Sequence, residues 1–480
     1  MGCEQSKVDY HPRKGVGATE HQGTSTTTRL RQRSSSESIL EAPLPKLDSS
    51  GNLMPEEVAK RVISSPMSKT VPILAKDELL ATLDYAFSTQ RGYYPDDVHK
   101  RNQDAFSITH DFAGQPGDSL FVIYDGHGKN GDVCAIWAKK HLPRLIAKYI
   151  KQERVRQNKL LGSPGGFNPK LWPLLTPDLI QAMCMKAHLE CNQLMHDDKS
   201  VEDSLSGTTA IAALFHGGRL TVCNVGDSRA VLGHKIRKTE MEEEKVEIED
   251  EWKEDKIMAV PLSRDQTPYR HDECERVKKA GASVMSVDQM EGSEPMHENW
   301  GDLYLGEDID VTGDPPRVWV KDTDYPGTAF TRSIGDKVAD GIGVTCEPEM
   351  LSMSLNHNDE MLILASDGVF EFLTNQAVVD IAASCATPVE ACEKIVKAAY
   401  EQWLHYELRT DDITCIVMFI SCDKEPAPGS ATVEQLLALA KEGMKPMRIN
   451  DRRAESQVMP GDFANDISQK ILNGVENTEQ

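Results

Sequence analysis

Four aspartates of this sequence each stand at one end of a short apolar run that has the composition of a β-strand. They are Asp104, Asp125, Asp367 and Asp411. Asp125 and Asp367 are followed by glycine, a pair that would present a carboxylate and a backbone carbonyl together. Oxygen ligands of this kind suit hard divalent cations such as Mg²⁺ and Mn²⁺. One Asp-Gly pair alone is an ordinary turn. Four carboxylates brought together without a cation would repel one another, so their convergence would imply a metal site.

The elements that would position these aspartates alternate between strand-like runs and segments of helical periodicity. The predicted strands include Ser119–Tyr124, Ala210–Phe215, Leu220–Val225, Met361–Ala365 and Ile413–Ile420. Several of them end in an Asp-Gly or Gly-Asp pair, as a strand followed by a turn does. Pro177–His196 and Pro388–Tyr406 instead carry apolar residues at helical spacing. The alternation predicts one large folded domain from about Leu79 to Cys422.

Polar segments flank and interrupt this domain. Residues 1–75 are rich in Ser, Thr, Pro and Arg, which predicts a disordered leader. Lys235–Lys256 holds ten acidic and six basic residues, which favours a solvated insertion on a loop or hairpin. Residues 423–480 form a polar tail in which Thr432–Met444 has the pattern of a short amphipathic helix.

Composition excludes several classes of protein. The 480 residues include 53 basic and 76 acidic ones, a formal charge of −23, so nucleic-acid binding is disfavoured. The sequence contains no run of eighteen apolar residues, so no transmembrane helix is expected. The eleven cysteines are scattered without a CxxC pair, which indicates reduced core residues of an intracellular protein.

The N-terminus carries a lipidation motif. The segment Met1–Ser6 matches the pattern for myristoylation of Gly2, and Cys3 is placed for palmitoylation. One myristoyl chain binds a bilayer only marginally, so a second signal is needed. Cys3 and the leader's net charge of about +3 over residues 1–34, from six basic and three acidic residues, are the two candidates. A chance match is the alternative, since many proteins begin Met-Gly.

An ordered series of eight motifs resembles the protein phosphatase 2C family of metal-dependent serine/threonine phosphatases. The motifs are Asn102-Gln-Asp-Ala, Tyr124-Asp-Gly-His-Gly, Ser206-Gly-Thr-Thr-Ala, Asn224-Val-Gly-Asp-Ser-Arg-Ala, Leu262-Ser-Arg-Asp-Gln-Thr-Pro, Gly327-Thr-Ala-Phe-Thr-Arg-Ser-Ile-Gly-Asp, Leu364-Ala-Ser-Asp-Gly-Val-Phe and Arg409-Thr-Asp-Asp-Ile-Thr. They span roughly residues 80–422. The resemblance implies an α+β fold, a four-layer αββα sandwich of two antiparallel sheets flanked by helices.

The resemblance also implies a centre of two Mg²⁺ or Mn²⁺ ions at one edge of the sandwich. Carried over by position, Asp125 would bridge both ions and the Gly126 carbonyl would join the second. Asp367 and Asp411 would bind the first ion, and Asp104 would contribute directly or through water. A water or hydroxide bridging the ions would attack phosphorus in line without a phosphoenzyme.

His127 would donate a proton to the leaving serine or threonine oxygen. A solvent-exposed histidine beside a turn is the structural alternative. Asp203 and Glu371 lie near positions where the family places a weaker third metal, and Asp203 is shifted by one residue. Asp412 replaces a frequent asparagine and is not expected to bind metal directly.

Two departures from the family pattern concern the start of the site. Gln103 stands where many members have glutamate, so one carboxylate near the metals is neutral. The family's phosphate-binding arginine has no clean equivalent. His99, Lys100 and Arg101 are the nearby candidates and Arg91 a more distant one, and we favour Lys100.

Other motifs are interpreted as scaffold. The segments 206–210 and 224–230 would shape core strands, with Gly226 and Asp227 making a turn. Residues 265–330 would form the flap beside the site, where substrate choice tends to reside.

The predicted activity is hydrolysis of phosphoserine and phosphothreonine in proteins, at the cytoplasmic face of a membrane and with a cytosolic pool. A monomer is expected. A membrane-tethered pseudophosphatase is the alternative, and retention of the carboxylates and His127 argues against it. A metal nuclease is opposed by the acidic charge and the lack of a basic groove.

Overall fold

The computed structural model describes residues 46, 54–75, 78–160, 174–236, 256–297, 306–309 and 313–425. Gly2, Cys3, most of the acidic insertion and the predicted helix 432–444 lie outside them. The chain divides into two compact units. The short helix α1 (Pro55–Ala59) belongs to the unit that spans 6–60, and the described residues from Arg61 onward belong to the other.

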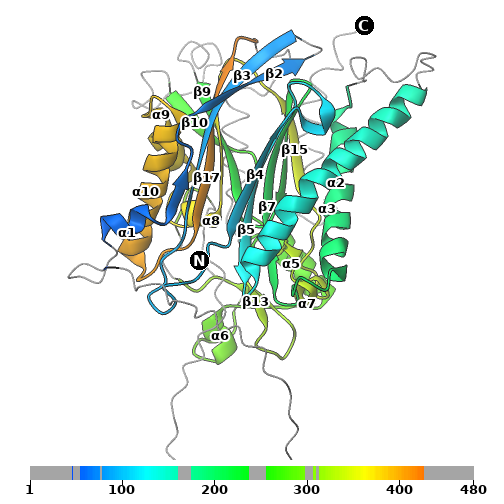
Figure 1. The fold of residues 1–480 in the computed structure, drawn as a ribbon. Coiled ribbons are helices and arrows are strands. Elements are labelled where there is room, and N and C mark those ends of the chain that lie inside the picture. Colours follow the sequence, from blue (N-terminus) through cyan, green and yellow to red (C-terminus); the bar gives the residue numbers. More distant parts are fainter. Residues whose placement is uncertain are drawn as a thin grey trace, which may run out of the picture. The chain divides into compact units, whose positions relative to one another are not determined.

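Two antiparallel sheets form the centre of the larger unit (Figure 1). In the first, the strand order is β1-β3-β17-β16-β9-β10, with β2 beside β3. Its strands are β1 (Val62–Ser64), β2 (Lys69–Ala75), β3 (Glu78–Gln90), β9 (Arg229–Ile236), β10 (Lys256–Pro261), β16 (Asp359–Ala365) and β17 (Ile413–Cys422).

In the second sheet the order is β14-β6-β5-β7-β8-β15, with β4 beside β5. Its strands are β4 (Asp104–His110), β5 (Ser119–Gly128), β6 (Ser206–Thr208), β7 (Ala210–His216), β8 (Arg219–Val225), β14 (Ile334–Gly335) and β15 (Glu349–Ser354). A 3-10 turn, η1 (Phe112–Gly114), joins β4 to β5. The sheets face each other across a buried layer that includes Phe121, Phe215 and Ile416.

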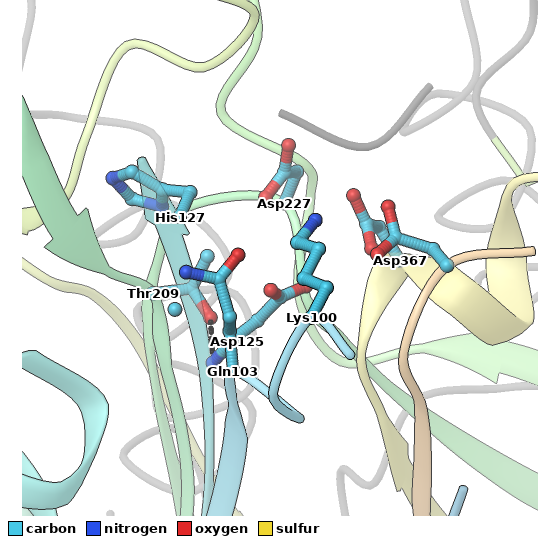
Figure 2. Close-up of a pocket in the computed structure, with 9 residues that line it drawn as sticks. Lys100, Gln103, Asp125, His127, Thr209, Asp227 and Asp367 are labelled. Carbon is cyan, nitrogen blue, oxygen red and sulfur yellow. Dashed lines mark hydrogen bonds between the residues drawn. The ribbon is translucent and has the colours of Figure 1, made fainter. Parts of the chain in front are cut away.

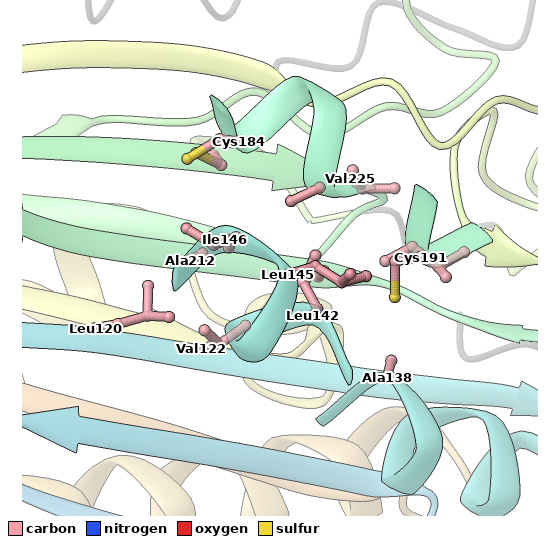
Figure 3. Close-up of a cluster of buried hydrophobic side chains, with 14 of the residues drawn as sticks. Leu120, Val122, Ala138, Leu142, Leu145, Ile146, Cys184, Cys191, Ala212 and Val225 are labelled. Carbon is pink, nitrogen blue, oxygen red and sulfur yellow. The ribbon is translucent and has the colours of Figure 1, made fainter. Parts of the chain in front are cut away.

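Helices cover the outer face of each sheet. α2 (Gly131–Leu160) and α3 (Pro177–Asp197) pack on the second sheet through a core that includes Leu142 and Ile146 of α2 (Figure 3). α8 (Asp367–Phe370), α9 (Asn375–Ala383) and α10 (Pro388–Tyr406) cover the first. The four-layer αββα sandwich is therefore confirmed. None of the helices in the described part of the chain is long and apolar enough to span a bilayer.

The local predictions agree with the structure except at the start of the domain. The five predicted strands lie in β5, β7, β8, β16 and β17, and both helices form. Nine of the ten cysteines among the described residues are buried. The acidic insertion joins β9 to β10, which pair as an antiparallel hairpin.

The boundary at residue 75 was wrong. β1 and β2 pair with β3, and Ile73 is completely buried. These strands were missed because β1 is only three residues long and Pro72 lies within β2, which is compatible only with an edge position.

The flap is a small layer of its own. It contains α5 (His271–Ala280), α6 (Val287–Glu291) and a sheet of β11 (Ser283–Met285), β12 (Arg317–Trp319) and β13 (Pro326–Thr328). α7 (Lys337–Asp340) follows β14. Glu273 of α5 is 2% exposed and accepts hydrogen bonds from Thr331 Oγ1, Arg332 Nη2 and Arg276 Nη2, each at 2.6 Å. This buried ion-pair network ties the flap helix to the segment that leads into β14.

We expect Glu273→Gln to destabilise the fold by about 3 kcal/mol, because it removes the buried carboxylate that the partly buried Arg332 and Arg276 guanidinium groups share. Burial alone would raise the pKa of Glu273, but the hydrogen bonds and charges of Arg332 and Arg276 outweigh it and hold that pKa well below its ordinary value of 4.5. The stabilisation is therefore present above pH 4.5 and is lost as pH falls below it.

Urea unfolding across this pH range measures both effects, with the exposed neighbour Glu275→Gln as the matched control. Equal stability of the two variants at pH 7 would contradict the assignment.

Candidate metal centre and active site

The strand-end aspartates meet in one pocket at the edge of the sandwich. Figure 2 shows its side chains converging from both sheets. The pocket is lined by Lys100, Gln103, Asp125, Gly126, His127, Thr209, Asp227, Asp367 and Asp411. Asp104 lies beside Asp125, since it is the cross-strand partner of Asp125 in the pairing of β4 with β5. The five residues predicted as ligands of the first two metals are thus brought together.

Burial and neighbouring carboxylates raise the pKa of Asp125, Asp104 and Asp367. For Asp125 the causes are burial, then the charges of Asp367, Asp104 and Asp411. Burial is also the largest cause for Asp104 and for Asp367. Burial and mutual repulsion make these carboxylates costly without a compensating cation, as expected of a site built for positive charge.

The donor set fits hard divalent cations. Asp104 Oδ2 accepts a hydrogen bond from Ser366 Oγ at 2.9 Å, whereas Asp104 Oδ1 is buried with no hydrogen-bond partner. An orphaned buried carboxylate oxygen is costly unless a cation binds it. Carboxylate and carbonyl oxygens without sulfur or imidazole are the ligands that Mg²⁺ and Mn²⁺ prefer.

Asp412 supports the site from behind. Its Oδ1 accepts the Gly92 N–H at 2.6 Å and its Oδ2 accepts the Gln103 N–H at 2.7 Å. Both oxygens are thus used by the backbone, in agreement with the interpretation that Asp412 is not a direct ligand. Gly368 makes room for it, because a Cβ there would lie 1.9 Å from the Asp412 carbonyl oxygen.

Asp203, predicted near the third metal, is not among the pocket-lining residues, and its carboxylate Oδ2 is hydrogen-bonded to Nδ1 of His196 at 2.5 Å. Asp227 lines the pocket instead, and burial followed by the charges of Asp367 and Asp265 raises its pKa to about 7. Glu371 lies four residues after Asp367 at the end of α8, hence on the same helical face.

Asp227 could have been found from the sequence. The Gly226-Asp227 pair follows the strand Leu220–Val225, which is the same strand-end pattern that singled out the other aspartates. It was assigned to the turn instead, because Asp-Gly and Gly-Asp pairs in hairpins are common.

His127 is buried, not exposed, and it is oriented by Asp336 and by Phe330 at the end of the flap. The side chain is 5% exposed, and its Nε2 is hydrogen-bonded to Oδ2 of Asp336, itself 2% exposed. The Phe330 ring packs on the imidazole with centroids 4.2 Å apart. Gly207 permits this arrangement, because a Cβ there would lie 2.2 Å from Asp336 Oδ2. The segment 206–210, interpreted as scaffold, therefore leaves space for Asp336, the partner of His127.

Lys100 is the basic candidate that reaches the pocket. It lines the pocket, with Nζ 3.7 Å from the centroid of the Tyr94 ring, and the Tyr94 hydroxyl donates to Asp411 Oδ1 at 2.5 Å. Arg101 is exposed and pairs with Asp132 at 3.3 Å. The Gln103 amide donates to the Gly128 carbonyl at 2.7 Å, so it fixes the turn after His127.

Comparison with known proteins decides the family. The protein phosphatase 2C model matches residues 96–405. A probable protein phosphatase 2C 35 of Arabidopsis thaliana is 40% identical over 337 residues, which cover 70% of this chain and 83% of that protein. The chain belongs to the protein phosphatase 2C family.

More distant relatives agree. A probable protein phosphatase 2C 73 of Oryza sativa subsp. japonica is 26% identical over 354 residues, 70% of this chain and 74% of that protein. The crystal structure of a serine-threonine phosphatase 2C from Toxoplasma gondii has the same fold, with a TM-score of 0.50 and 17% identity over 74% of this chain and 100% of that one.

The protein is accordingly a metal-dependent serine/threonine protein phosphatase. Nothing in the described residues favours the pseudophosphatase alternative, since the carboxylates and the histidine lie together in one pocket.

Proposed function

We propose that this phosphatase removes phosphate from phosphoserine and phosphothreonine side chains at a centre of two Mg²⁺ or Mn²⁺ ions. Asp125, the Gly126 carbonyl, Asp367 and Asp411 would hold the ions, with Asp104 directly or through water. Asp227 and Glu371, rather than Asp203, would hold a weaker third ion. The convergence of buried carboxylates with raised pKa values carries this proposal.

The bound ions would neutralise these carboxylates, lower the pKa of the attacking water and offset the charge of the phosphoryl group. The chain's own residues supply orientation and a proton. Lys100 reaches the pocket as a cation for phosphate oxygens. Asp336 engages Nε2 of His127, so Nδ1 is the ring nitrogen left to give a proton to the leaving serine or threonine oxygen.

Phosphate release from a phosphothreonine peptide tests the function. We expect turnover with Mn²⁺ or Mg²⁺ and none with EDTA, because the carboxylates repel phosphate when no cation neutralises them. Lys100→Ala should raise KM more than it lowers kcat, since it removes a phosphate contact made in both ground and transition states. A folded protein without turnover in either metal would overturn the proposal and make Gln103 the first residue to examine.

We also propose that the protein is a monomer, anchored by acylation at Gly2 and Cys3 to the cytoplasmic face of a membrane, with a cytosolic pool. The Met1–Ser6 motif supports this proposal. A single acyl chain gives marginal binding, so a second signal is required for a stable membrane-bound fraction.

Gly2→Ala should shift the protein from the membrane fraction of lysed cells to the soluble fraction, because myristoylation requires the N-terminal glycine. Catalysis on a soluble phosphopeptide should be unchanged in this variant. Retention of Gly2→Ala on membranes would show that acylation at Gly2 is not the anchor.

A further inference from the structure

The outer face of α2 carries a stripe of apolar and basic side chains. Counted at 3.6 residues per turn, Val133, Ile136, Lys140, Arg144 and Lys151 fall within a narrow sector of the helix. All five are exposed. Figure 3 shows the opposite side of α2, where Ala138, Leu142, Leu145 and Ile146 enter the core against the second sheet. The stripe is therefore the ridge of the helix that faces away from the protein.

The positive charge of this ridge is not neutralised by neighbouring acids. Two other basic residues of α2 are paired, Lys148 with Glu190 at 2.8 Å and Arg156 with Glu153 at 2.6 Å. Lys140, Arg144 and Lys151 have no ion-pair partner within the described part of the chain. A row of uncompensated cations is unusual on a chain whose formal charge is −23.

Two occupants of the ridge are disfavoured. A second copy of the chain would place like charges against each other. The acidic insertion is the second. It is anchored at Ile236 and Lys256, which belong to the first sheet, and this sheet is covered by α9 and α10, whereas α2 covers the other sheet.

An anionic bilayer has the complementary chemistry. Its headgroups attract juxtamembrane lysines and arginines, and its interface accommodates apolar side chains beside them. Val133 is 39% and Ile136 60% exposed at the end of the ridge. The net negative charge does not oppose this contact, because charges farther than a Debye length of about 8 Å are largely screened.

We infer that the outer face of α2 is a membrane-contact surface for anionic phospholipid headgroups, with Lys140, Arg144 and Lys151 as the contacting cations. The inference deepens the proposed acyl anchoring by naming a second signal within the folded domain. None of the pocket-lining residues belongs to α2, so the cations of this face take no part in the pocket.

Vesicle sedimentation of the full chain, made with and without N-myristoylation, tests the surface. The variant is Lys140→Gln/Arg144→Gln/Lys151→Gln. The matched control is Lys279→Gln/Lys394→Gln/Lys397→Gln, which loses the same charge from exposed positions on α5 and α10. Each is measured on phosphatidylcholine vesicles with and without phosphatidylserine.

We expect the α2 variant to bind phosphatidylserine vesicles on the order of 100-fold more weakly than wild type, at about fivefold per cation. Its activity on a soluble phosphopeptide and its binding to pure phosphatidylcholine should be unchanged. The control variant should bind phosphatidylserine vesicles like wild type, and added salt should weaken wild-type binding.

Equal binding of wild type and the α2 variant to phosphatidylserine vesicles would overturn the inference. The inference would also be overturned if the α2 face bound soluble polyglutamate but not the vesicles, because that result would assign the face to an acidic polypeptide. The acylation proposal fails separately, if the mass of the protein made for N-myristoylation lacks the myristoyl group. The preference of the unacylated chain for phosphatidylserine is measured independently of that mass.

Discussion

Asp125→Asn should reduce kcat/KM for a phosphothreonine peptide by more than about 100-fold, since even residues that only orient a metal ligand are worth 10–100-fold. The same change should stabilise the protein in EDTA. Asp125 lies among Asp367, Asp104 and Asp411, whose charges disfavour its ionised form in the absence of cations. An asparagine of the same shape removes that repulsion.

Thermal unfolding with EDTA and with Mn²⁺ measures the second effect. Wild type should gain stability on adding Mn²⁺ through binding to the folded state, and Asp125→Asn should lose most of that gain while melting higher than wild type in EDTA. Asp203→Asn is the control, because Asp203 pairs with His196 away from the pocket and should keep the response to metal. A wild-type response in Asp125→Asn would remove this aspartate from the metal centre.

Asp336→Asn should slow hydrolysis of phosphoserine and phosphothreonine peptides by about 100-fold, toward the lower end of what a positioned general acid contributes. Asp336 accepts the Nε2 proton of His127, which fixes the orientation of the ring, and the Nδ1 proton of the doubly protonated ring is the one given to the leaving group. An asparagine would remove the negative charge that accompanies this doubly protonated form. The alkoxide of serine or threonine is a poor leaving group, so it depends on the proton that His127 supplies.

The leaving group separates positioning from damage to the fold. With p-nitrophenyl phosphate, whose phenolate needs no proton, Asp336→Asn should retain a rate close to wild type. Gly207→Ala should imitate it, since the added Cβ would lie 2.2 Å from Asp336 Oδ2. Asp340→Asn, at the end of the short helix that Asp336 precedes, is the control. Equal losses on both substrates would mean that Asp336 has only a structural role.

The family, the sandwich and the aspartates that meet in the pocket could all be predicted from the sequence alone. These predictions rest on local patterns, because an aspartate next to an apolar run can be recognised as a strand-end residue without knowing where that strand lies in the sheet. The helices Pro177–Asp197 and Pro388–Tyr406 were equally readable, since each begins after a threonine cap and shows helical spacing. The family resemblance then supplied the roles of the aspartates and of His127.

Which distant groups meet depends instead on how the elements pack together. His127 and Asp336 are 209 positions apart, and no local pattern pairs them. Asp203 and Asp227 are both acidic residues near the expected third site, but the pairing of Asp203 with His196 and the turn after β8 place only Asp227 in the pocket. Lys100 and Arg101 are adjacent in the sequence, but the Lys100 side chain lines the pocket whereas the Arg101 side chain is exposed and pairs with Asp132. Such choices depend on packing between elements, where one residue of register or one helical turn moves a side chain to another face.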